Sequence, residues 1–164
     1  MLREQIVPRL LKEVPGQPAL ERLEASKSTG RLHRFAVIFD REGYSPVLFK
    51  DLLDLFIACY TYRKNPGEDW PPSEFIERTV QLPHGQKVQM KLAERGVWLG
   101  KLLWVREIRK LTGSGHQVAI DTTDFIAPVE RVAGSMFARW SQENFFKARR
   151  VSRLGNCLNM KTID

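Results

Sequence analysis

The feature that most constrains the fold of this chain is an apolar run that ends at an acid. Residues 35–39 read FAVIF, and Asp40 follows directly. Such a run, bounded by polar residues, is typical of a strand buried on both faces of a sheet, and ligands of open α/β sheets bind at the carboxyl ends of strands. A carboxylate there is either a metal ligand or the N-cap of the next helix. Because Ser45 and Pro46 already provide a helix start, Asp40 is a candidate site residue.

The residues after Asp40 predict a helix followed by a second strand. Ser45 is a suitable N-cap, and Pro46 is a suitable first helical residue. Apolar residues then recur at helical spacing to about residue 56, and residues 57–62 read as a strand. A strand, a helix and a strand over this length form a βαβ unit. We therefore expect the two strands to be parallel.

The pattern of apolar residues changes between residues 70 and 125. Apolar and polar residues alternate on both sides of a turn at residues 83–85, as in an antiparallel hairpin. A second hairpin is predicted to pair residues 102–110 with residues 116–122 across the turn at 113–115. The sequence therefore predicts an antiparallel β insertion into the α/β unit.

The remaining segments are predicted to be helical. Residues 1–30 read as two short helices separated by prolines and a glycine, and a long helix is expected from Pro128 to about Arg153. The predicted organisation is a helical N-terminal segment (1–30), an α/β core in two parts (31–69 and 126–156), a β-rich insertion (70–125) and a tail (157–164).

The composition is that of a globular protein with an excess of positive charge. The chain has 164 residues, a formal net charge of +7 and a sequence pI of about 9.7, so a polyanion is the first partner to consider. Basic residues cluster before the first strand, in the second hairpin and in the last helix. One such cluster is often only a solvated surface, but together the clusters favour nucleic acid.

The sequence gives no indication of a membrane or secretory protein. No window approaches the length of a membrane span, and the N-terminal residues do not resemble a signal peptide. Cys59 and Cys157 are far apart and lack metal-ligand spacing. We therefore expect a cytoplasmic protein with free thiols, associated with the nucleoid if its partner is DNA, and no membrane partner.

The last helix contains charged residues at a spacing that places them on one face. Arg139, Glu143, Lys147 and Arg150 fall in a narrow arc that also includes Met136. Aromatic residues surround the rest of this helix, which indicates a partly buried position in which a glutamate usually has a partner or a metal. The alternative is an ordinary ion pair between Arg139 and Glu143, one helical turn apart.

Together, these motifs resemble DDE transposases of the bacterial insertion-sequence type. One subgroup with a β insertion has the signature Tyr, two residues, Arg, three residues, Glu, six residues, Lys. Here those places hold Met136, Arg139, Glu143 and Arg150, so two residues match, one keeps its charge and the tyrosine is replaced. The segments FDREGYSP, LTGSGHQVAIDTT and ARWSQENFFK also look like this group. The resemblance covers roughly residues 31–153.

The resemblance implies a fold and a chemistry. The fold would be α/β, a partial RNase H-like core with an antiparallel β insertion before the last long helix. Asp40 and Glu143 would be the second and third catalytic acids and would hold Mg²⁺ or Mn²⁺ for DNA strand cleavage and transfer. Arg139, Arg150 and Lys147 would contact phosphates or orient Glu143.

The first catalytic acid of such enzymes would precede Asp40, but residues 1–39 contain no aspartate. We therefore expect this chain to be the C-terminal part of a transposase that does not cleave DNA alone. The strand at residues 35–39 would then expose an apolar edge and favour self-association, which is compatible with a transposase homo-oligomer.

The resemblance also implies DNA contacts in the β insertion, with transposon ends as the partner. Trp98 or Trp104 would stack on a flipped base, although a tryptophan on an alternating strand is more often in the core. Arg106, Arg109 and Lys110 would follow the phosphate backbone. The alternative function, from a different class, is a non-catalytic basic module that binds DNA or another transposase subunit.

Overall fold

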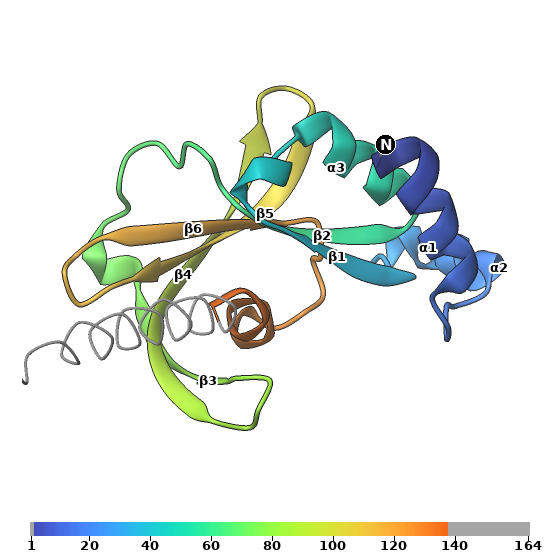
Figure 1. The fold of residues 1–164 in the computed structure, drawn as a ribbon. Helices are drawn as coiled ribbons and strands as arrows, with labels where there is room; N and C mark the ends of the chain where they lie inside the picture. The colour runs from blue at the N-terminus through green and yellow to red at the C-terminus, as the bar shows by residue number, and fades with distance from the viewer. Residues whose placement is uncertain (1, 138–164) are drawn as a thin grey trace, which may run out of the picture.

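The computed structural model describes residues 2–137, which form a curled mixed sheet with helices packed at one end (Figure 1). The sheet has six strands in the order β1-β2-β6-β5-β4-β3. The strands are β1 (Phe35–Phe39), β2 (Ile57–Tyr62), β3 (Ile76–Gln81), β4 (Lys87–Leu99), β5 (Leu103–Leu111) and β6 (Gln117–Thr122). The α-helices are α1 (Val7–Glu13), α2 (Leu20–Ala25) and α3 (Pro46–Asp54), with a π-helical turn η1 (Leu2–Ile6) and 3-10 turns η2 (Ser26–Ser28), η3 (Arg41–Gly43) and η4 (Pro72–Glu74). Residues 129–137 are also helical.

The predicted βαβ unit is confirmed. Strands β1 and β2 pair in parallel, with Phe35 opposite Ile57, and α3 connects them. Ser45 is the N-cap of α3, because its hydroxyl accepts a hydrogen bond of 3.3 Å from the backbone N–H of Leu48. The two short N-terminal helices are also present, as α1 and α2.

Both predicted hairpins are confirmed, and their strands continue the same sheet. Strand β3 pairs with β4, and β5 pairs with β6, in both cases antiparallel. Strand β6 also pairs antiparallel with β2, with Asp121 opposite Thr61. The residues predicted as an insertion therefore supply the strand that satisfies the second edge of β2.

The prediction that residues 35–39 form a strand buried on both faces is wrong. Phe39 is buried, and Phe35 and Val37 pack beside it against α1 and α3, but Ala36 and Ile38 on the other face are exposed. The reason is position, because β1 is the end strand of the sheet. The predicted burial describes β2, in which residues 57–61 are all buried. One of them is Cys59, whose N–H donates to the Thr123 hydroxyl at 2.9 Å.

Two apolar clusters cover opposite faces of the sheet. One includes Phe49 and Leu52 of α3 together with Leu99 and Leu103, which flank the turn between β4 and β5. The other surrounds the helical segment 129–137 on the concave face, where Val132 and Met136 pack on β5 and β6. Gly134 permits a close approach of the same segment to β3, since a Cβ there would lie 2.7 Å from the carbonyl oxygen of Gln81. None of the helices within residues 2–137 has the length and apolar character required to cross a membrane.

Candidate nucleic-acid interface around Asp40

Asp40 lies at the carboxyl end of β1, where its backbone and side chain are both fixed. Its Oδ1 accepts hydrogen bonds from the N–H groups of Glu42 at 3.1 Å and Gly43 at 3.3 Å, so the carboxylate caps η3 rather than α3. The Thr61 hydroxyl donates to its carbonyl oxygen at 3.3 Å. The side chain nevertheless remains exposed to solvent. Asp40 is therefore both an N-cap and an accessible carboxylate.

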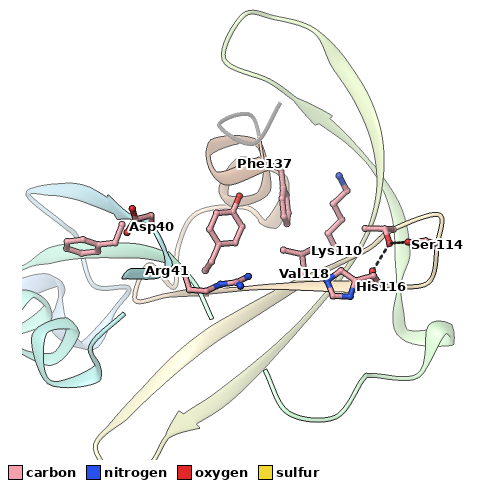
Figure 2. Close-up of a pocket in the computed structure, with 10 residues that line it drawn as sticks. Asp40, Arg41, Lys110, Ser114, His116, Val118 and Phe137 are labelled. Carbon is pink, nitrogen blue, oxygen red and sulfur yellow. Dashed lines mark hydrogen bonds between the residues drawn. The ribbon is translucent and has the colours of Figure 1, made fainter. Parts of the chain in front are cut away.

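Beside Asp40 is a hollow of about 580 Å³ that opens on the concave side of the sheet (Figure 2). Its walls come from the ends of β1 and β2, from the β5–β6 hairpin and from the helical segment 129–137. Sheet order explains the meeting of these elements, because β6 lies next to β2. The lining residues are Phe39, Asp40, Arg41, Tyr62, Lys110, Thr112, Ser114, His116, Val118 and Phe137.

The hollow combines cations, hydroxyl groups and aromatic walls. Arg41 extends from the end of β1 toward His116, and both side chains are exposed (Figure 2). The Lys110 ammonium lies 5.1 Å from the ring centroid of Phe137. A second hollow of about 550 Å³ shares Lys110 and Thr112 with the first, so Lys110 stands between the two. This chemistry suits a phosphodiester with an adjoining sugar or base.

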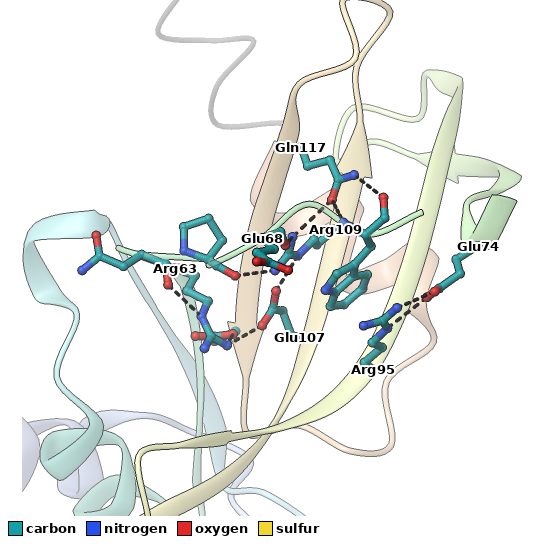
Figure 3. Close-up of polar contacts among 11 residues, drawn as sticks. Arg63, Glu68, Glu74, Arg95, Glu107, Arg109 and Gln117 are labelled. Carbon is teal, nitrogen blue, oxygen red and sulfur yellow. Dashed lines mark hydrogen bonds and ion pairs between the residues drawn. The ribbon is translucent and has the colours of Figure 1, made fainter. Parts of the chain in front are cut away.

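Arg109 is not part of this surface. It is 2% exposed, and its guanidinium contacts Glu107 at 2.6 Å and the carbonyl oxygen of Glu68 at 2.8 Å (Figure 3). Glu107 also pairs with Arg63, whose side chain is 17% exposed and which contacts Asp121 as well. Glu107, Asp121 and Arg109 are therefore the buried ionisable groups under the loop that follows β2. Its burial argues against the predicted phosphate contact, and Arg109 instead holds this loop on the sheet.

Asp121 is the most perturbed acid among the described residues that titrate. Burial raises its pKa to about 7, and the adjacent Glu107 acts in the same direction while Arg63 opposes the shift. The Tyr44 phenol, four residues after Asp40, interacts electrostatically with Asp121, and burial raises the pKa of that phenol too. The sequence contained a signal for this network. Val105, Glu107 and Arg109 occupy every second position of β5, so the two charged residues share the strand face of an apolar one.

Arg106 and the two tryptophans lie apart from the hollow. The Arg106 side chain is 14% exposed and bonds Glu94 at 2.6 Å and the carbonyl oxygen of Ala127, so it anchors the connection into the helical segment 129–137. Trp98 and Trp104 face each other across β4 and β5, with ring centroids 5.5 Å apart. They are 58% and 44% exposed, which places them on the surface and not in the core.

The remaining predicted site residues lie outside residues 2–137. They are Arg139, Glu143, Lys147 and Arg150. Within the described part of the chain, no three His, Cys, Asp or Glu side chains cluster as a metal site. Asp40 is the carboxylate that lines the hollow, and it is a suitable Mg²⁺ ligand because Mg²⁺ keeps several waters and uses few protein carboxylates.

Comparison with known protein families identifies a match over most of the chain. The family model described as "Transposase protein", Transposase_29, matches residues 1–154. No curated protein is similar enough to this chain to count as a match.

Proposed function

The chain belongs to the transposase family whose model matches residues 1–154, and from this premise we propose that it binds DNA in the hollow beside Asp40 during DNA transposition. One observation carries the proposal: Arg41, Lys110 and His116 meet an accessible carboxylate in a hollow with aromatic walls. The net charge of +7 supports a polyanionic partner such as a transposon end. With such a partner, the protein would act in the cytoplasm, at the nucleoid.

The proposed core is RNase H-like. The parallel β1-α3-β2 unit, with an acid at the carboxyl end of β1, supports this assignment. In it, Asp40 and Glu143 would hold Mg²⁺ or Mn²⁺, which polarises phosphoryl oxygens when bound. Arg139, Lys147 and Arg150 would contact phosphates near Glu143. Because residues 1–39 contain no aspartate that could serve as a further acid, we propose that residues 1–164 do not cleave DNA by themselves.

The exposed tryptophans extend the proposed DNA surface to the β4–β5 hairpin. Trp98 and Trp104 offer aromatic faces that suit an unstacked base, and such stacking is worth about 1–3 kcal/mol per base. Lys110 would contact the phosphate backbone. Arg106 and Arg109 would support the strands that carry these groups, since the sheet itself occupies both guanidinium groups.

The test of DNA binding is a salt titration with a labelled mixed-sequence duplex. Lys110→Ala and Arg41→Ala should each weaken binding and reduce the salt slope by about one, because each removes one phosphate contact. Lys50→Ala is the control, since this lysine is exposed on α3 and pairs with Asp54 at 2.9 Å. Equal affinity of all three variants and the parent chain would contradict the proposed hollow.

The metal is tested separately by calorimetric titration of Mn²⁺ into Asp40→Asn and Glu143→Gln. Asn is also a good N-cap, so Asp40→Asn should keep η3 while it weakens metal binding. A second candidate is a non-catalytic DNA-binding module, which the cationic lining of the hollow, Arg41 and Lys110, also supports. Salt-sensitive DNA binding with no Mn²⁺ affinity would support that second candidate.

A further inference from the structure

The two edges of the sheet are built differently. Strand β3, at one edge, carries Glu77 and Arg78, and charged residues on an edge strand discourage pairing with another chain. Strand β1, at the other edge, consists only of apolar residues, without a charge or a proline. Within residues 2–137 its only strand neighbour is β2 (Figure 1). Strand β1 therefore presents an unprotected edge.

The backbone groups that face outward on β1 can be assigned from the ladder. The N–H and C=O of Cys59 on β2 both bond Thr123, on the β6 side. The residues on either side of Cys59 must then point toward β1. In the parallel register these neighbours bond Phe35, Val37 and Phe39. The N–H and C=O groups of Ala36 and Ile38 consequently point away from the sheet.

We propose that β1 pairs antiparallel with β1 of a second copy of this chain, about a two-fold axis that passes beside Val37. In this register Ala36 lies opposite Ile38 of the second copy, and both residues direct their free backbone groups at each other. Four hydrogen bonds join the strands, and a small side chain faces a large one on the exposed side. A two-fold interface needs this self-complementarity.

The charges that flank β1 match the same register. Arg34 directly precedes the strand and Asp40 directly follows it, so the pairing brings each arginine near the aspartate of the other copy, within reach of a guanidinium that donates to Gln17 at 3.2 Å in the single chain. The pairing therefore places an opposite charge at both ends of the new ladder. A shift of the register by two residues would lose both charge pairs and the Ala36–Ile38 match.

Light scattering on the full chain tests the association. The parent chain should reach twice its 19.0 kDa as concentration rises. Ala36→Pro should return the mass to that of one chain, because it removes an outward N–H and leaves the β1–β2 ladder intact. Thr79→Pro is the matched control at an outward N–H of β3 and should remain dimeric. A parent chain that stays monomeric, or an Ala36→Pro variant that dimerises like the parent chain, would overturn the proposal.

A disulfide tests the register independently of proline effects. Residues at a two-fold axis in a non-hydrogen-bonded pair have Cα atoms about 4.5 Å apart, which suits a disulfide. Val37→Cys, with Cys157 replaced by Ser, should therefore form a covalent dimer on mild oxidation. Cys59 stays in place because it is 1% exposed. Thr79→Cys should give only background cross-linking, and the same yield at both positions would refute the proposed pairing.

Discussion

At the residue scale, the charged groups under the loop after β2 determine how substitutions of these same groups change the free energy of unfolding. Glu107 and Asp121 lie opposite each other on β5 and β6 and are each 1% exposed. Arg63 bonds both acids, and Arg109 bonds Glu107. Charges this deep are stabilised only while their partners remain, since the cost of desolvation is large.

The raised pKa of Asp121 predicts a stability that falls with pH. Its pKa is about 7 in the folded chain against an ordinary value of 3.8, so between these values the folded form binds more protons. Stability should decrease as pH rises from about 4 to about 7 and level off above, by roughly 2–4 kcal/mol in total. Asp121→Asn should flatten this slope in urea unfolding measured across the range. An unchanged slope would exclude Asp121 as its source.

Glu107→Gln should be strongly destabilising. The substitution leaves Arg63 and Arg109 short of one negative charge in a buried position, which typically costs about 3–5 kcal/mol. Glu74→Gln is the control, because Glu74 pairs with Arg95 where both side chains are well exposed, 38% and 42%. The control should lose under about 1 kcal/mol in the same urea titration. Similar losses in both variants would contradict the structural role of Glu107.

Some predicted site residues are recognisable from a local sequence pattern, whereas the position of others depends on contacts between distant segments. Asp40 was found because its signal is local, an apolar run that ends at an acid. Lys110 was predicted to contact DNA, but its position beside Asp40 depends on the β2–β6 pairing, which no local pattern contains. Arg109 was expected on an exposed hairpin, and its burial depends on the loop at Pro66 and Glu68 that folds over it.

At the scale of elements, the helical segment 129–137 and β3 meet without a side chain between them. A Cβ at Gly134 would lie 2.7 Å from the Gln81 carbonyl oxygen and 3.3 Å from Val80 Cγ1. Gly134→Ala should therefore push the segment off the strand, and overpacking of this kind costs about 1–3 kcal/mol. Ser135→Ala, at the next position, should change stability by less than about 0.5 kcal/mol. Thermal unfolding of both variants checks this expectation.

The elements themselves were largely predictable from the sequence. Alternation around residues 83–85 and 113–115 located both hairpins, and Ser45-Pro46 located the start of α3. The burial of β1 was not predictable, because an apolar run has the same appearance in a central strand and in an end strand. The joining of the β-rich segment to β2 depends on residues about 60 positions apart, such as Cys59 and Thr123, 64 apart.

At the scale of the whole molecule, the proposed dimer and the proposed metal site share Asp40. In the dimer its carboxylate lies across from Arg34 of the second copy, whereas in the DNA-bound form it would contact Mg²⁺. Mg²⁺ should therefore shift the equilibrium toward monomer more than NaCl does at equal ionic strength. Sedimentation velocity at several Mg²⁺ concentrations measures this shift.

Asp40→Asn provides the control for that competition. The variant should dimerise more weakly than the parent chain, because it loses the charge opposite Arg34, and it should no longer respond to Mg²⁺ beyond the effect of salt. An identical Mg²⁺ response in the parent chain and the variant would place the competing cation elsewhere.

Cys59 gives the folded chain a chemical probe of its own opening. Its thiol is 1% exposed in the middle of β2, and burial raises its pKa to about 12. Alkylating reagents attack the thiolate, so they react only after β2 has separated from its neighbours. With Cys157 replaced, the labelling rate would measure how frequently the centre of the sheet opens by local unfolding and whether a bound ligand slows that opening.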